Sequence, residues 1–188
     1  MKKKSVVPKN AKKAFQGVVY DVYQWKQKLF DGSFAIFEKV KRPDAVTIIA
    51  IVGDKILIQK QAQPFKGKFL SLPGGRIDPG EKPLQAAKRE FLEETGYVSK
   101  NSSLWEVFSP ASGMFFSEYT YIFRDCQKIQ EQKLDAGEQI KCELVSFEKF
   151  LKLSDLDAFR HRSLTVLLLR MRLNSNLKAE FKKLLFKK

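Results

Sequence analysis

The chain has 188 residues, of which 44% are hydrophobic, enough for one domain with a substantial core or one domain with an appendage. An apolar run near the end of the chain, residues 164–169 with only Thr165 interrupting, is closed by Arg170. That run is far too short to cross a bilayer, so the sequence predicts no transmembrane helix.

Basic residues outnumber acidic ones by 35 to 21, which leaves a net charge of +14. Eleven of the lysines lie near the two ends, at positions 2, 3, 4, 9, 12, 13, 178, 182, 183, 187 and 188. We favour a solubilising fringe, because no interleaved aromatic or glycine pattern marks a nucleic-acid module there. Attraction to a polyanion such as RNA, or to a membrane surface, is the alternative.

The two cysteines, Cys126 and Cys142, lie in unlike surroundings and form no close metal-binding pair. Two buried thiols in a reducing compartment are the plainer interpretation, and a disulfide is the alternative. Residues 1–4 have the charge of a signal peptide start, but residues 8–13 are polar where its apolar core would follow. We therefore expect a cytoplasmic protein.

The first half of the chain reads as two β-hairpins. Residues 18–30 and 33–40 are rich in aromatic residues and flank Asp31-Gly32, a strong hairpin signal. Residues 45–52 and 55–60 flank Gly53-Asp54 in the same way. A short strand at residues 69–72 then runs into a glycine turn at Gly74-Gly75.

A helix is predicted for residues 82–95, because Pro83 suits its first turn and the stretch has no interior glycine until Gly96 ends it. Its carboxylates Glu90, Glu93 and Glu94 project within about one turn of each other. Three like charges would destabilise the helix. A hard divalent cation, magnesium first and manganese second, would offset that repulsion.

Beyond this helix the sequence predicts strands at residues 104–108, 118–125 and 140–145. A helix at residues 147–153 follows the N-cap residue Ser146, and a longer helix is predicted for residues 155–173. Asn174-Ser175-Asn176 separates it from a last amphipathic turn with Leu177, Phe181, Leu184 and Leu185. These elements predict an α/β fold with a mixed sheet.

Residues 75–97 carry the most informative pattern in the chain. They fit G-x5-E-x7-R-E-U-x-E-E-x-G-U, where U is a bulky apolar residue, and the pattern resembles the signature of the Nudix hydrolases. Its positions are filled by Gly75, Glu81, Arg89, Glu90, Phe91, Glu93, Glu94, Gly96 and Tyr97. The resemblance implies an α-β-α sandwich and an enzyme that cuts the pyrophosphate linkage of a nucleoside diphosphate joined to another group.

The resemblance also implies roles for these residues. Magnesium ions would bind Glu90, Glu94, Glu93 and the Gly74 carbonyl, and would lower the pKa of a bound water. Arg89 can pair with Glu81 and with Glu93, and so orient the metal ligands.

Related enzymes carry an acidic loop before the strand at Ile140, in which a glutamate is the general base or a metal ligand. Glu138 is the candidate here and Asp135 the reserve. A solvated carboxylate with no catalytic role is the alternative.

Residues 14–44 resemble the N-terminal β-extension of ADP-ribose and nucleoside diphosphate sugar pyrophosphatases. That extension commonly forms a homodimer and supplies part of the base pocket of the partner subunit. Trp25 is therefore a candidate for stacking on the base, along with Tyr20, Tyr23 and Phe30. For any one of these rings, packing in the core or the interface is the stronger expectation.

Three further substrate contacts are expected. Arg42, at the entry to the first core strand, would contact phosphate or the partner subunit, with a surface salt bridge as the alternative. Residues 109–118 resemble the family segment S-P-G-x-x-x-E, with Gly113 as its glycine but with Ala111 and Ser112 inserted.

The third expected contact is Gln61, which lies in a segment that departs from the family pattern. The chain has Gln61-Ala62-Gln63 where relatives often have Gln-x-Arg. The missing arginine leaves Lys60, Lys66 or Lys68 to contact pyrophosphate.

The predicted organisation is a basic arm at residues 1–13, a β-extension at 14–44, a catalytic core at 45–153 and C-terminal helices at 154–188. The predicted function is Mg²⁺-dependent hydrolysis of ADP-ribose or a nucleoside diphosphate sugar to a nucleoside monophosphate and a sugar phosphate. Hydrolysis of an RNA 5′ end or a nucleoside triphosphate is the first alternative. A non-catalytic ligand-sensing domain is the second, and it would need a damaged signature, whereas this one is intact.

Overall fold

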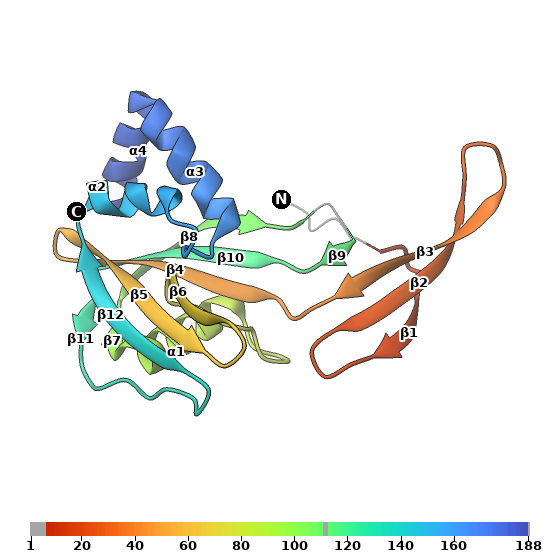
Figure 1. Ribbon diagram of the computed structural model, residues 1–188, viewed down its shortest axis with the longest axis horizontal. Helices are drawn as coiled ribbons and strands as arrows, with labels where there is room; N and C mark the ends of the chain where they lie inside the picture. The colour runs from red at the N-terminus through yellow and green to blue at the C-terminus, as the bar shows by residue number, and fades with distance from the viewer. Residues whose placement is uncertain (1–6, 111–112, 188) are drawn as a thin grey trace.

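The computed structural model describes residues 7–110 and 113–187. A central sheet lies between helix α1 on one face and helices α2, α3 and α4 on the other, and the first three strands extend away from it as a separate sheet (Figure 1). The predicted α-β-α sandwich with a mixed sheet and a preceding β-hairpin is thus confirmed.

The separate sheet has the strand order β1-β2-β3-β9, from Lys12–Gln16, Asp21–Lys28, Phe34–Lys41 and Met114–Phe115. The hairpin of β2 and β3 turns at Asp31-Gly32 as predicted, with Gly32 at a φ of 87°. Strand β1 lies partly within the predicted basic arm. The sequence did not predict it, because its fully exposed residues give no hydrophobic alternation. Residues 1–6 of that arm and the predicted insertion at Ala111-Ser112 lie outside the described residues.

The central sheet has the order β12-β5-β4-β10-β8, and β6 also pairs with β5. Its strands are β4 Ala45–Val52, β5 Lys55–Gln63, β6 Gly67–Ser71, β8 Asn101–Phe108, β10 Glu118–Arg124 and β12 Gln139–Val145. Strands β7 (Tyr97–Val98) and β11 (Gln127–Lys128) form a small pair beside it. Along β5, Leu57 packs in the core beneath α1, whereas Ile56 and Ile58 pack beneath the C-terminal helices. Odd-numbered β5 residues therefore face α1.

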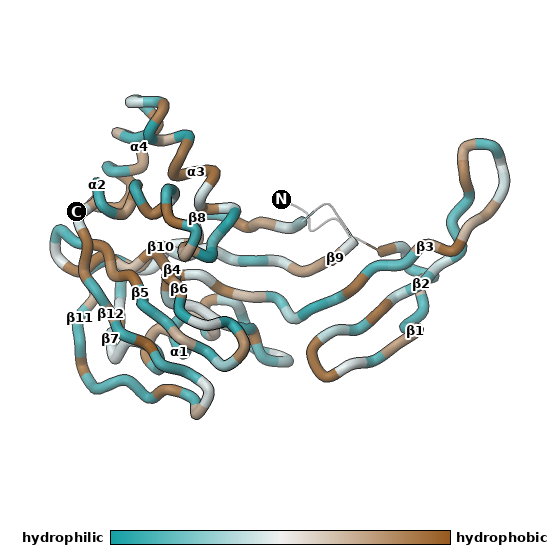
Figure 2. The backbone as a smooth tube through the Cα atoms, in the orientation of Figure 1, coloured by the Kyte–Doolittle hydropathy of each residue, from teal (hydrophilic) through white to brown (hydrophobic). Residues whose placement is uncertain are grey.

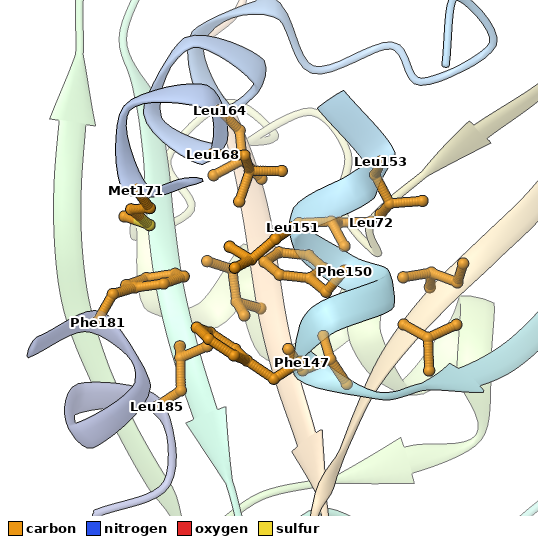
Figure 3. Packing of buried hydrophobic residues seen from close by; sticks show 14 of the residues in the cluster. Leu72, Phe147, Phe150, Leu151, Leu153, Leu164, Leu168, Met171, Phe181 and Leu185 are labelled. Carbon is orange, nitrogen blue, oxygen red and sulfur yellow. The ribbon is translucent and has the colours of Figure 1, made fainter. Parts of the chain in front are cut away.

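The C-terminal helices are α2 (Phe147–Leu151), followed by a 3₁₀ turn at Lys152–Asp155, then α3 (Arg162–Leu173) and α4 (Ser175–Leu185). Ser146 caps α2 as predicted, since its side chain accepts the Lys149 N–H. Figure 3 shows Phe147, Phe150 and Leu151 of α2 packed against residues of α3 and α4, among them Leu168 and Phe181. This layer packs the last part of the chain onto the central sheet.

The helix predicted for residues 155–173 begins only at Arg162. Residues 156–161, which we call the connecting segment, run alongside β6 instead. The Leu70 N–H donates to the Ala158 carbonyl at 2.8 Å, and the Arg160 N–H donates to the Leu70 carbonyl at 3.0 Å. Pairing with the edge of β6 satisfies backbone groups there, and this favours the extended conformation over a helical one.

Both cysteines are free thiols, Cys126 buried and Cys142 half-buried. None of the described helices is long and apolar enough to span a membrane.

Candidate active site

Helix α1 (Pro83–Thr95) presents the carboxylates of the site. Pro83 occupies its first turn, and the Gln85 side chain accepts the Lys82 N–H at 3.1 Å. Gly96 ends the helix at a φ of 75°, with its N–H bonded to the Leu92 carbonyl at 2.8 Å. The helix predicted from sequence is therefore confirmed at both ends.

The glycine turn after β6 lies against these carboxylates. The Gly74 N–H donates to Glu94 Oε2 at 2.9 Å. A Cβ atom on Gly75 would lie 2.6 Å from Glu90 Oε2 and closer still to the rest of that carboxylate. Only a residue without a side chain allows the backbone to approach the helix this closely.

Glu94 is 5% exposed and is held from two sides. Besides the Gly74 N–H, its Oε2 accepts the side-chain amide of Gln59 at 3.0 Å. Burial raises the pKa of Glu94 to about 8, although both hydrogen bonds oppose the rise.

A buried polar network lies behind Glu94. The Gln61 amide donates to Gln59 Oε1 at 2.6 Å and to Ser71 Oγ at 2.7 Å. The structure therefore places Gln61, expected as a substrate contact, behind Gln59 and only 7% exposed. The sequence signal for Gln59 and Gln61 was the recurrence of glutamine at alternate positions of β5.

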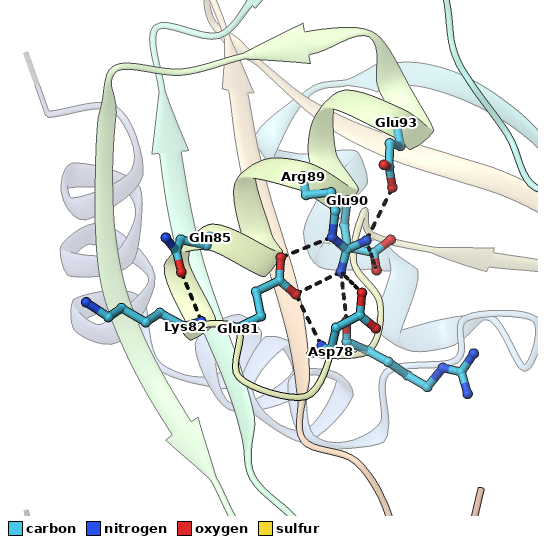
Figure 4. A network of polar contacts seen from close by, with 8 residues as sticks. Asp78, Glu81, Lys82, Gln85, Arg89, Glu90 and Glu93 are labelled. Carbon is cyan, nitrogen blue, oxygen red and sulfur yellow. Dashed lines mark hydrogen bonds and ion pairs between the residues drawn. The ribbon is translucent and has the colours of Figure 1, made fainter. Parts of the chain in front are cut away.

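Arg89 connects Glu90 and Glu93 of α1 with Glu81, which precedes the helix, as Figure 4 shows. Its Nε and Nη2 each donate to Glu81 at 3.0 Å, while Nη1 donates to Glu90 at 2.9 Å and to Glu93 at 3.2 Å. The predicted pairing of Arg89 with Glu81 and Glu93 is confirmed. Burial raises the pKa of Glu90, and Arg89 opposes that rise.

Glu138 faces this group from the loop before β12. Burial raises its pKa most, and the charges of Asp135 and Glu93 add to the rise. Its own charge contributes to the raised pKa values of Glu90 and Glu94, after burial as their main cause. Asp135 is exposed and supplies its carbonyl to the Glu138 N–H at 3.0 Å. Of the two loop carboxylates, it is thus Glu138 whose charge acts on Glu90 and Glu94.

The donor set suits a hard cation. In the described parts of the chain no three acidic, histidine or cysteine side chains form a finished metal site. Arg89 holds Glu90 and Glu93, and Glu94 is turned to Gly74 and Gln59. The site nevertheless contains only oxygen ligands, and burial raises the pKa values of two of its carboxylates, Glu90 and Glu94. Those residues fit a divalent cation such as magnesium.

The other predicted substrate residues lie apart from α1 (Figure 1). Trp25 packs on Phe37 with ring centroids 6.1 Å apart, and its indole N–H donates to Gln27. The Arg42 guanidinium lies 4.2 Å from the Phe116 ring centroid. The Gly113 carbonyl accepts the Val40 N–H at 2.8 Å. Within one chain these residues belong to the separate sheet and its connections.

His161 supports the glycine turn and was missed because the sequence placed it inside a helix. Its Nε2 accepts the Leu72 N–H at 3.1 Å, and its Nδ1 lies 3.9 Å from Glu118 Oε1. Burial lowers the pKa of His161, against the opposing charge of Glu118. A neutral imidazole therefore fixes the chain two residues before Gly74.

Comparisons with known proteins agree with this geometry. The family model described as NUDIX domain matches residues 41–168. The chain is 33% identical to the ADP-ribose pyrophosphatase of Bacillus subtilis over 144 residues, covering 74% of this chain and 77% of that protein. It is 30% identical to the ADP compounds hydrolase NudE of Escherichia coli over 111 residues, covering 57% of this chain and 59% of that one. A crystal structure described as an ADP compounds hydrolase shares its fold with a TM-score of 0.71 at 20% identity, covering 89% of this chain and 94% of that one.

Proposed function

The chain belongs to the NUDIX family of hydrolases, and we propose that it cuts the pyrophosphate bond of ADP-ribose or a nucleoside diphosphate sugar. The products are a nucleoside monophosphate and a sugar phosphate. The observation that carries the proposal is the gathering of Glu90, Glu93 and Glu94 beside the Gly74-Gly75 turn, where the charge of Glu138 also acts on Glu90 and Glu94.

Nudix hydrolases generally use a divalent metal, and the metal proposed here is Mg²⁺, with Mn²⁺ as a substitute. Glu90, Glu94, Glu93 and the Gly74 carbonyl would hold it. When bound, it neutralises phosphate oxygens and lowers the pKa of a coordinated water.

The side chains then have distinct tasks. Glu138 accepts a proton from the attacking water as its oxygen bonds to phosphorus and the bridging P–O bond breaks in line. Gln59 and the Gly74 N–H fix the orientation of Glu94. Arg89, held by Glu81, keeps Glu90 and Glu93 on the same side of the helix.

A homodimer is part of the proposal. No helix covers the separate sheet in the described part of the chain (Figure 1), although hydrophobic residues recur along it (Figure 2). Phe15, Phe34 and Ile36 are 62%, 55% and 67% exposed, and sheets with such faces are usually stabilised by packing on another layer. A second copy of the chain would cover them and bring Trp25, Arg42 and Gly113 toward a partner's site. The two free thiols fit a cytoplasmic location.

Product analysis tests the proposal. The wild-type protein is assayed with Mg²⁺ and then Mn²⁺ on ADP-ribose, nucleotide sugars, NADH, a nucleoside triphosphate and capped RNA. We expect a monophosphate and a sugar phosphate from the first two classes, and Glu94→Gln to abolish most of that turnover. Release of inorganic pyrophosphate from the triphosphate alone would favour the alternative enzyme class. Failure on every substrate would refute an enzymatic role.

A further inference from the structure

The connecting segment delivers an arginine to the catalytic face of the sheet. Phe159 pairs in parallel with Leu70 and packs in the core beneath the C-terminal helices. Side chains alternate along an extended segment, so Arg160 points to the opposite face, which is the face of α1. Its guanidinium lies 4.8 Å from the Phe69 ring centroid. Phe69 is the register partner of Gln61, which belongs to the Glu94 network.

Arg160 is fixed in place there. Its Nη2 donates to the Lys66 carbonyl at 2.8 Å, in the turn between β5 and β6. The Lys66 ammonium donates to Gln63 Oε1 at 2.7 Å and lies 6.0 Å from the same Phe69 ring. Two cationic side chains from distant parts of the sequence thus flank one aromatic ring.

Neither of these two cations is held by an ion pair within the described part of the chain. Throughout residues 7–110 and 113–187, no carboxylate forms an ion pair with Arg160 or Lys66, whereas Arg89 and Arg172 both have acidic partners. Arg160 is exposed and uses one N–H on the Lys66 carbonyl, which leaves the rest of its fork for a ligand. The Lys66 charge also opposes the pKa rise that burial causes at Glu138, which places this turn near the candidate general base.

We propose that Arg160 and Lys66 form an anion subsite that binds a phosphoryl group of the substrate diphosphate. This inference rests on the proposed function. A guanidinium fork matches phosphate oxygens, and stacking on Phe69 restricts its conformations before the ligand arrives. The Gln63 side chain holds Lys66 in this subsite. Arg160 joins it from the connecting segment, about one hundred residues later in the sequence.

Steady-state kinetics of Arg160 variants test the subsite. Arg160→Gln removes the charge and keeps a shorter polar side chain, and Arg160→Ala removes the side chain beyond Cβ. Arg162→Ala is the matched control, because Arg162 is exposed, begins α3 and, like Arg160, forms no ion pair with any described residue. With ADP-ribose and Mg²⁺ we expect KM to rise about 10- to 100-fold in both Arg160 variants, with kcat little changed and the control like the wild type.

A metal-free binding measurement separates this inference from the proposed function. Calorimetry with inorganic pyrophosphate needs no turnover, so it remains valid if ADP-ribose is not the substrate. We expect pyrophosphate affinity to fall at least 10-fold in Arg160→Gln and to stay unchanged in Arg162→Ala. Wild-type affinity for pyrophosphate in Arg160→Gln, or KM values within twofold of the wild type in both Arg160 variants, would overturn the subsite.

Discussion

Adding one methyl group at Gly75 should separate catalysis from folding. Gly75→Ala introduces a Cβ 2.6 Å from Glu90 Oε2, whereas ordinary contacts begin near 3.4 Å. The Glu90 carboxylate must therefore move by about 1 Å. Gly75 does not have the positive φ of Gly74, so alanine fits its backbone, and the clash is the main perturbation.

The expected cost differs between stability and rate. The displaced atoms are the end of a flexible side chain, so the main loss is the partly exposed bond from Arg89 Nη1 to Glu90. We expect about 1 kcal/mol, or a fall of roughly 2–4 °C in Tm. A displacement of about 1 Å at a reacting centre can cost roughly 100-fold in rate, and we expect that loss in kcat/KM.

Thermal unfolding and ADP-ribose hydrolysis are measured on the wild type, Gly75→Ala and Gly137→Ala. Gly137 is the control, because a Cβ there meets nothing within 4 Å and its φ is not positive. The control should stay within about 1 °C and threefold of the wild type. A Gly75→Ala protein with kcat/KM within threefold of the wild type would show that Glu90 does not act at the reacting centre.

Three other substitutions test the supporting structure. Gln59→Leu removes a donor that lowers the pKa of Glu94, so that pKa should rise above about 8. Because protons then compete more strongly with Mg²⁺ for Glu94, the Mg²⁺ concentration for half-maximal activity should rise more at pH 7 than at pH 9. His161→Ala leaves the buried Leu72 N–H without an acceptor, so we expect a loss of about 2 kcal/mol in stability and a fall of roughly 4–8 °C in Tm. His161→Gln should recover part of that loss. Equal Tm values for the two variants would contradict the role of the bond. Lys149 and Lys60 hold the pKa of Glu143 at about 2, below its usual 4.5, so its stabilisation is present above pH 4.5 and is lost as pH falls toward 2. The Tm difference between wild type and Glu143→Gln should be small but constant above about pH 5 and should vanish near pH 2, and a difference that grows in acid would refute this.

Local signals in the sequence were enough for much of this fold. Gly32 and Gly96 have positive φ angles at a hairpin turn and at a helix end. Both positions could be predicted from the residues that adjoin them in the sequence. The carboxylates of α1 were predictable for the same reason, since helical spacing sets their separation. The pairing of Arg89 with Glu81 also follows from one short stretch of chain.

Contacts between distant parts of the sequence account for what was missed. The connecting segment contains no strong helix breaker, and only its pairing with Leu70 makes it extended. That single difference changes the positions of two side chains. In the extended segment Arg160 reaches the Lys66 carbonyl and His161 reaches the Leu72 N–H, contacts that a helix through residues 155–173 did not predict. The buried environment of Gln61 was not predicted for a related reason, since it depends on the face of β5 that α1 covers.

The contacts of Arg89 suggest how one site can be stable both without and with a cation. Glu81 takes two donors of the guanidinium and ligates nothing in our proposal, so it remains a partner of Arg89 in either state. Glu90 and Glu93 share only Nη1, at 2.9 Å and 3.2 Å. A cation could therefore draw both carboxylates away while Arg89 stays paired with Glu81. Without a cation, the same arginine reduces the repulsion between two carboxylates on adjacent turns. In this arrangement Glu81 keeps Arg89 paired while Glu90 and Glu93 exchange the guanidinium for the cation. This gives an acidic residue outside the helix a part in the proposed site.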